Sequence, residues 1–248
     1  MQQSTINFDI NKIIFDDPSS IFHILTESEK QLFCSHMEVK HYRKGEYICR
    51  TGEVPKGLLC LINGTAKIFR IGAGGRKHIF RIVKPNELIG YIALFADMIY
   101  GASARAIENS AAVIINRETM FSLLRSNSEL SLRFIKSLST ELGFSYFRTM
   151  TLTQKQMPAR LAESLLFLRD NYGFEDDNVT LKVCLSREDL ASISNMTTSN
   201  AIRTLSSFAR KNLISTEGKR IKLIDISGLE EISGEQAKCL KISSSKVL

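Results

Sequence analysis

The 248-residue sequence predicts an α+β protein in which an N-terminal antiparallel β-roll, a jelly roll, precedes a long helix and a small C-terminal domain of helices and one hairpin. Three observations predict this architecture. Glycines punctuate short apolar segments, a long proline-free stretch follows, and a tight turn joins two short amphipathic helices. We expect an N-terminal extension at 1–22, the roll at 23–116, a helical segment at 117–158, the C-terminal domain at 159–228 and a tail at 229–248.

The composition is that of a globular protein. Hydrophobic residues make up 44% and charged residues 24%, with 14 glycines and 4 prolines, which excludes disordered and fibrous classes. The most apolar stretch, residues 88–104, is interrupted by Gly90, Asp97 and Gly101 and is too short to span a bilayer. The acidic N-terminus lacks the features of a signal peptide. We expect a cytoplasmic protein without a membrane partner, and its net charge of +7 favours an anionic one.

The cysteines predict neither a disulfide framework nor a metal site. They are odd in number, widely spaced, and contain no C-x-x-C pair. We expect free thiols and no metal, and no cofactor is predicted. The five are Cys34, Cys49, Cys60, Cys184 and Cys239.

The β-roll prediction rests on five strand-like segments separated by turns. They are residues 44–53, 56–71, 76–83, 102–107 and 110–116. Gly72, Gly74 and Gly75 mark a hairpin tip, because glycine adopts positive φ without penalty. An antiparallel sandwich or barrel accommodates short strands of this kind.

Residues 129–153 predict a long helix that packs along a partner helix. The segment has no proline and one glycine, and its apolar side chains recur at three- and four-residue steps. We expect a second copy of the chain to cover this stripe; the alternative is burial of the helix within its own domain. The stripe consists of Ile135, Leu138, Leu142, Tyr146 and Thr149 or Met150.

A helix-turn-helix is predicted at residues 187–210. Ser186 and Asp189 have capping-box spacing, Asn195 suits a left-handed turn, and Thr197 can cap the second helix. The expected core face of that helix is Ala201, Ile202, Leu205, Phe208 and Ala209. The opposite face is polar and comprises Ser199, Asn200, Arg203, Ser206, Ser207 and Arg210.

A short strand at 179–184 and a basic hairpin at 214–224, turning at Glu217-Gly218, complete a winged helix-turn-helix. A thin helix with a polar outer face fits the major groove of double-stranded DNA, about 12 Å wide. Thr198, Ser199 and Asn200 would reach bases, and the fork of Arg203 matches guanine O6 and N7. Phosphates would be held by Ser186, Arg187, Lys211, Lys219 and Arg220. The alternative is a helical hairpin for protein contacts with Arg203 solvated.

Over residues 23–226 the chain resembles the Crp/Fnr superfamily of bacterial transcription regulators. The resemblance lies in the segments YRKGEYICRTGE, LINGTAKIF, ELIGYIALF and LSREDLASISNMTTSNAIRTLSSFARKNLISTEGKRIKLID. It implies a roll like those that bind cyclic nucleotides, a dimerisation helix and a winged helix-turn-helix, with RNA polymerase as a partner of activators. It places Arg203 at the base-reading arginine of the family. Thr198 and Ser199 stand where the cyclic-AMP receptor has Arg and Glu, so we expect a different DNA half-site.

The sensor departs from the cyclic-nucleotide-binding members of that family. Those members follow the glycine at Gly90 with a Glu that holds the ribose, and carry Arg-Ser-Ala about ten residues later. Here the Glu is replaced by Tyr91 and the Arg-Ser-Ala by Tyr100-Gly101-Ala102. A buried phosphate would lack its charged partner, so cyclic nucleotide binding is not expected. Arg105 lies near this site, but its spacing predicts that it points to the other face of the strand.

The resemblance defines an effector region whose ligand is unknown. Aromatic rings there either line a pocket for an apolar ligand or fill it. An iron–sulfur cluster needs four ligands, whereas Cys34 stands alone, and the spacing of Cys34, His36 and His41 supports no haem site. The predicted effector residues are Gly90, Tyr91, Ile92, Tyr100, Gly101, Ala102, Ser145 and Tyr146.

The sequence therefore predicts a homodimeric, sequence-specific transcription regulator that reads an inverted repeat through the helix at 198–210. The alternative is a module that senses a small molecule or cyclic nucleotide and acts through protein contacts. An enzyme is not expected, because no nucleophile–base set or phosphate-binding glycine loop is found.

Overall fold

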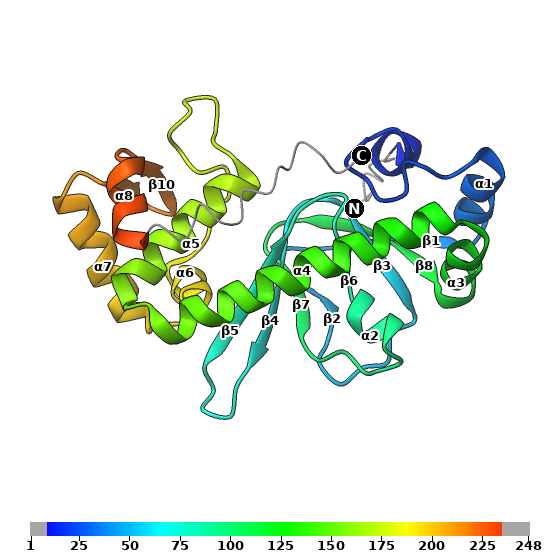
Figure 1. Ribbon diagram of the computed structural model, residues 1–248, viewed down its shortest axis with the longest axis horizontal. Helices are drawn as coiled ribbons and strands as arrows, with labels where there is room; N and C mark the ends of the chain where they lie inside the picture. The colour runs from blue at the N-terminus through cyan, green and yellow to red at the C-terminus, as the bar shows by residue number, and fades with distance from the viewer. Residues whose placement is uncertain (1–8, 235–248) are drawn as a thin grey trace, which may run out of the picture. The chain divides into compact units, whose positions relative to one another are not determined.

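The computed structural model describes residues 9–234 and divides into two compact units, Met1–Thr140 and Glu141–Leu248 (Figure 1). The first unit contains the roll and the second the helix-turn-helix. The long helix α4, Ser128–Gln154, begins in the first unit and ends in the second. Within residues 9–234, no helix is both long enough and apolar enough to cross a membrane.

The first unit is built on two four-stranded antiparallel sheets, which confirms the predicted roll. One sheet has the order β1-β8-β3-β6, with bounds Met37–Tyr42, Ser110–Asn116, Gly57–Asn63 and Leu88–Ile89. The other has the order β2-β7-β4-β5, with bounds Tyr47–Cys49, Ser103–Ala106, Ala66–Ile71 and Lys77–Val83.

The roll is packed tightly enough to require glycine at one strand crossing. Gly57 pairs with Asn116 at the start of β3. A Cβ atom at Gly57 would lie 2.1 Å from the backbone oxygen of Ile115, so no larger residue fits without moving β8. Strand β3 is buried from Gly57 to Ile62, and small alanines of β4, β7 and β8 line the interior beside it.

Residues 10–25, most of them in the predicted N-terminal extension, pack into the core of this unit. The π-helix η1 spans Asn11–Phe15, and α1, Glu27–Ser35, begins at a capping box between Thr26 and Glu29. The Phe33 ring of α1 lies 5.1 Å from the rings of both Phe15 and Phe22 in edge-on contacts. This segment is therefore part of the fold of the roll.

Three helices complete the first unit. Helix α2, Tyr91–Phe95, follows β6, and α3, Arg117–Ser126, is capped by the Asn116 side chain, which accepts a hydrogen bond from the Thr119 amide. The first turns of α4 pack on the same core through Leu130 and Phe134. The predicted long helix at 129–153 is thus confirmed within one residue at each end.

The second unit contains α5, Met157–Tyr172, then α6, Arg187–Ile193, and α7, Thr198–Arg210. The hairpin β9–β10, Ile214–Glu217 and Arg220–Leu223, follows, and α8 spans Ile226–Ser233. Pro158 lies in the first turn of α5, where its missing N–H costs no hydrogen bond. The winged helix-turn-helix is confirmed, with the hairpin turning at Gly218-Lys219.

Two expectations for this unit were wrong. Residues 179–184 form no strand: Thr180 and Leu181 each make an isolated bridge. Just before them the chain turns, and the Asp177 carboxylate accepts hydrogen bonds from the Val179 and Thr180 amides. Residues 229–233, expected to begin the C-terminal tail, belong instead to α8, and Leu229 is fully buried there. Residues 235–248 lie outside the described residues.

Candidate nucleic-acid interface

The two helices of the helix-turn-helix begin at side-chain caps. The Ser186 hydroxyl accepts a hydrogen bond from the Asp189 amide at 3.0 Å, and the Thr197 hydroxyl accepts one from the Asn200 amide at 3.2 Å. Asn195, in the turn between the helices, has a φ of +49°, the left-handed conformation that Asn tolerates. Local side-chain chemistry therefore fixes where α6 ends and α7 begins.

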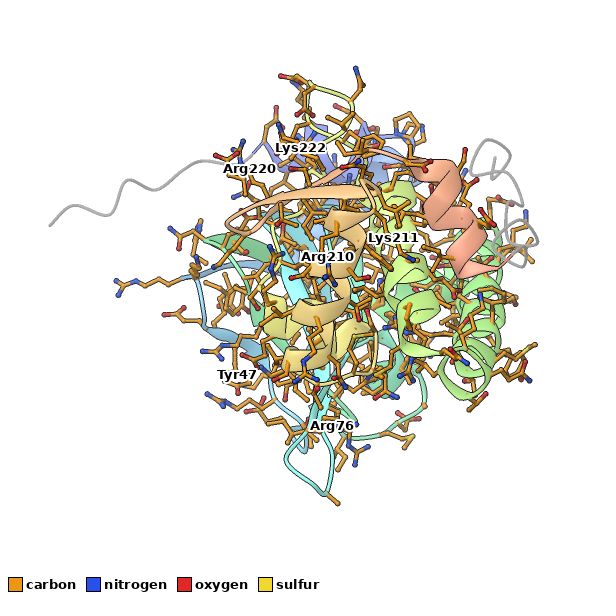
Figure 2. All side chains as sticks on the ribbon, turned by 90° about the vertical axis from the view of Figure 1, so that its left-hand side faces the viewer. Tyr47, Arg76, Arg210, Lys211, Arg220 and Lys222 are labelled. Atoms are coloured by element: carbon orange, nitrogen blue, oxygen red, sulfur yellow. The ribbon has the colours of Figure 1, made fainter. Side chains whose placement is uncertain are left out.

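Helix α7 separates an apolar face from a polar one. Ala201, Leu205 and Phe208 are buried. The outward side chains include Ser199, Arg203, Ser206 and Arg210, and Figure 2 shows Arg210 at the end of α7. Burial of one stripe thus leaves the predicted polar face at the surface.

One predicted core residue of α7 is wrong. The Ile202 side chain is 46% exposed. Successive residues of a helix are rotated by about 100°, so the buried stripe through residues 201, 205 and 208 turns residue 202 outward. Ala209, also expected in the core, is half-buried.

The base-reading candidates lie together on the first two turns of α7. Thr198, Ser199 and Arg203 are exposed, and within residues 9–234 no carboxylate or carbonyl binds the Arg203 guanidinium. Asn200 is half-buried, and its amide Nδ2 donates to the Met157 sulfur at 3.3 Å. Three of the four candidates therefore face solvent directly.

The phosphate-binding candidates divide into two groups. Lys211, Lys219 and Arg220 are exposed around the end of α7 and the hairpin, and Figure 2 labels Lys211 and Arg220 there. Sequence reasoning missed Lys222, also labelled in Figure 2, which lies two residues after Arg220 and so on the same face of β10. The alternation of side chains along a strand is the sequence signal that would have added Lys222 to the candidates.

Arg187 has a different role in the structure from a simple surface cation. Its Nη2 donates to the carbonyl oxygen of Gly218 at 2.9 Å, which holds the hairpin turn against the start of α6. Its Nη1 is buried without a hydrogen-bond partner among the described residues. Arg187 therefore positions the hairpin, and Ser186 beside it supplies the cap of α6.

Polar side chains at the end of α4 bind α6 and α5 through hydrogen bonds. Arg148 of α4 donates to the Ile193 carbonyl at the end of α6 at 3.1 Å. The Glu163 carboxylate of α5 accepts from Thr151 at 3.0 Å and from Lys155 at 2.9 Å, and the Lys155–Glu163 pair is largely buried. Burial lowers the pKa of Arg148, an effect that the nearby Glu163 opposes. These contacts fix the end of α4 on the domain that carries α7.

Two of the predicted effector residues, Gly90 and Tyr100, lie against each other in the roll. Gly90 has a φ of +83°, and a Cβ atom there would lie 2.6 Å from Cε1 of the Tyr100 ring. Tyr100 is 6% exposed and packs in the roll interior with Tyr42 and Cys49. Tyr91 is buried in the other core cluster of this unit. The Tyr100 ring thus occupies the space directly above Gly90.

The remaining effector candidates are mostly at the surface. Ile92 is 66% exposed, Gly101 is exposed and Ala102 is half-buried. Ser145 and Tyr146 are exposed on α4.

Three polar groups of the roll interior, Tyr42, Cys49 and Tyr100, are neutral at physiological pH. Burial raises the pKa of Tyr42 to about 12 and that of Cys49 to about 11, and it also raises the pKa of Tyr100. Arg105, a charged group that could reach a phosphate, instead donates through Nε to the Gly45 carbonyl and stacks over the Tyr47 ring. The Arg105 guanidinium is thus engaged by Gly45 and Tyr47.

The predicted dimer stripe on α4 is exposed along most of its length. Ile135 and Leu142 are exposed, as is Thr149, whereas Leu138 is half-buried against the first core. Sequence reasoning missed Leu132, which is exposed three residues before Ile135 and extends the stripe by one turn.

Among residues 9–234, no group of three or more His, Cys, Asp or Glu side chains is arranged to hold a metal ion. Cys49 and Cys60 are buried, and Cys34 and Cys184 are exposed free thiols. Burial raises the pKa of Cys60 to about 12. Cys239 lies outside the described residues.

Replacing Glu163 should destabilise the domain that carries α7. In Glu163→Gln, the largely buried Lys155 ammonium loses its ionic partner, so we expect the free energy of unfolding to fall by about 1–3 kcal/mol. Urea denaturation followed by circular dichroism measures the change. The exposed Glu231 offers a matched control, and Glu231→Gln should change stability by less than about 0.5 kcal/mol. Equal effects of the two variants would contradict the supporting role of Glu163.

The comparisons with known proteins agree with this arrangement. Residues 39–127 match the model of the cyclic nucleotide-binding domain family, and residues 159–232 match that of the Crp-like helix-turn-helix domain. The chain is 24% identical over 209 residues to the CRP-like cAMP-activated global transcriptional regulator of Mycobacterium tuberculosis, an alignment that covers 84% of this chain and 93% of that protein.

Two further relatives extend the comparison. The transcriptional activator protein FnrA of Stutzerimonas stutzeri is 24% identical over 195 residues, covering 77% of this chain and 79% of that protein. The solved structure of FixK2 from Bradyrhizobium japonicum is similar in fold, with a TM-score of 0.72 at 18% identity, covering 80% of this chain and 98% of the other. The chain therefore belongs to the Crp/Fnr superfamily, as a transcription regulator with a cyclic-nucleotide-binding-like roll and a helix-turn-helix DNA-binding domain.

Proposed function

We propose that this regulator is a cytoplasmic homodimer without catalytic activity that reads an inverted-repeat operator through α7. The observation that carries the proposal is the outward face of α7, where Arg203 is exposed and no described carboxylate or carbonyl binds it. An exposed guanidinium on the second helix of a helix-turn-helix is placed to enter the major groove. In this proposal residues 23–116 form the sensor, 117–158 pair the protomers and 159–228 read DNA.

The contacts with DNA divide into reading and anchoring. Arg203 binds guanine through O6 and N7, and Thr198, Ser199 and Asn200 offer short groups to neighbouring bases or phosphates. Lys211, Lys219 and Arg220 bind phosphates, which fixes the register without selecting the sequence. Ser186 and Arg187 lie at the start of α6, where a phosphate would also approach the positive end of that helix.

The dimer forms along α4. Ile135, Leu142 and Thr149 are exposed at the spacing of a helix seam, an arrangement that burial against a second α4 would satisfy. Two α7 helices held about 34 Å apart reach successive turns of one face of DNA, so the operator is an inverted repeat. A regulator of this kind contacts RNA polymerase when it acts as an activator.

The sensor does not bind a cyclic nucleotide. Tyr91 replaces the family's Glu, and the Tyr100 ring packs on Gly90 where a ligand would otherwise approach the backbone. Tyr42, Cys49 and Tyr100 carry no positive charge in either protonation state, so none of them offsets the cost of enclosing a phosphate. The effector, if the regulator uses one, belongs to another chemical class, and neither haem nor an iron–sulfur cluster is proposed.

Replacing Arg203 tests sequence reading. Against an operator selected from random duplexes, Arg203→Ala should lose about tenfold or more in affinity, because each guanine contact contributes about 1–3 kcal/mol of discrimination. Lys211→Ala provides the contrast. It should weaken binding to the selected and the scrambled duplexes equally, and it should lower the slope of log affinity against log salt concentration by about one. Fluorescence anisotropy at several salt concentrations measures both. A wild-type protein without sequence preference would instead support a module that acts through protein contacts.

Placing a charge in the apolar stripe of α4 tests whether the protein dimerises through this helix. Leu142 is 53% exposed, and Leu142→Glu places a carboxylate in the proposed seam without disturbing a described core. We expect a monomer in sedimentation velocity and at least about tenfold weaker operator binding. Val54, which is 73% exposed in the roll, provides the control Val54→Glu, which should remain dimeric. A wild-type monomer, or a dimeric Leu142→Glu, would refute the seam.

Calorimetric titration tests the sensor. Addition of cyclic AMP or cyclic GMP should give no binding heat, and operator affinity should change by less than about twofold, because Tyr100-Gly101-Ala102 replaces the Arg-Ser-Ala that would pair with the phosphate. The M. tuberculosis relative, named as cAMP-activated, serves as the positive control. Saturable binding with a Kd in the micromolar range would overturn this part of the proposal.

A further inference from the structure

The outward face of α7 contains one large aliphatic side chain. Ile202 is 46% exposed, whereas Ser199, Arg203, Ser206 and Arg210 on the same side of the helix are polar. Single exposed apolar residues are common on protein surfaces, so exposure alone carries no conclusion. The position of Ile202 at the edge of the proposed reading face, beside Arg203, is what carries the inference.

Helix geometry places Ile202 at the edge of that face, between the polar side chains and the buried stripe. At about 100° per residue, Ile202 lies about 60° around the axis from Ser199, three residues before it, and about 40° from Ser206, four residues after it; both serines lie on the same side of Ile202. It also directly precedes Arg203, and neighbouring Cα atoms are about 3.8 Å apart. Base pairs stack at about 3.4 Å, so an Arg203 bound to guanine brings Ile202 over an adjacent base pair.

The chemistry of the groove then selects the base. In the major groove, adenine, guanine and cytosine present hydrogen-bonding groups, whereas thymine also presents its 5-methyl group. An isoleucine side chain forms no hydrogen bond, and it would remove water from a polar base edge without replacing the lost contact. Against the thymine methyl it buries apolar surface on both sides.

We propose that Ile202 specifies a thymine in each half-site, next to the guanine bound by Arg203, through contact with the 5-methyl group. This inference rests on the proposed function and adds to it a base identity at a position where the protein makes no hydrogen bond.

The test removes the methyl group alone. An operator is selected with the wild-type protein from random duplexes, and each thymine is replaced in turn by deoxyuridine in both half-sites. We expect one position per half-site at which deoxyuridine weakens wild-type binding about fourfold for each methyl lost. Placing 5-methylcytosine there, in place of cytosine, should recover part of the loss.

Variants then assign the effect to Ile202. Ile202→Ala should bind thymine and deoxyuridine duplexes within about 1.5-fold of each other, while Ile202→Val should keep most of the dependence because it retains a branched apolar surface. Ile224, which is 54% exposed in the same unit after β10, gives the matched control, and Ile224→Ala should keep the full dependence. Circular dichroism confirms that each variant is folded.

The possible results distinguish a failure of the Ile202 inference from a failure of the proposed function on which it rests. A wild-type protein that binds its operator selectively but tolerates deoxyuridine at every position refutes the role of Ile202 and leaves DNA reading intact. A thymine dependence that persists in Ile202→Ala refutes the assignment to this residue. Absence of any sequence preference in the wild type removes the proposed function and this inference together.

Discussion

The residues that α7 buries decide which of its side chains face solvent. Ala201, Leu205 and Phe208 anchor the helix to the second unit, and this anchoring decides which side chains remain outside. Because the helix is rigid, three buried positions determine the direction of every other side chain on it. A shift of one residue in the buried stripe would rotate Arg203 by about 100°, away from the outward face. Apolar packing therefore controls the polar surface.

The rest of the second unit reinforces that anchoring with directed polar contacts. Arg148 and Arg187 each donate to a main-chain carbonyl, one at the end of α6 and one in the hairpin turn. Glu163 accepts hydrogen bonds from Thr151, in the last turn of α4, and from Lys155, which directly follows that helix. Such bonds are directional and only partly exposed to solvent, so they restrict rotation between elements that apolar contact alone would let slide. The winged domain thus holds its helices and hairpin in one arrangement.

Local signals made much of this architecture predictable, and long-range contacts account for what was missed. The caps at Ser186 and Thr197 and the turn at Asn195 follow from side chains bonding to nearby backbone, which a sequence displays directly. Ile202 was misplaced because it borders the buried stripe, where periodicity alone leaves the choice open. The packing of Phe22 against Phe33 and the Arg187–Gly218 bond join elements through tertiary contacts that no short motif records.

The exposed stripe on α4 also has a consequence for how such a regulator responds to its own amount. Where pairing is required for tight binding and no small molecule drives it, the concentration of the paired form rises with the square of the protomer concentration, as long as most protomers are single. Doubling synthesis would then raise the DNA-competent population about fourfold. Pairing through Ile135 and Leu142 would in that way make DNA binding depend steeply on the amount of protein. The rates of synthesis and proteolysis would then control the regulator, as a second messenger does in other systems.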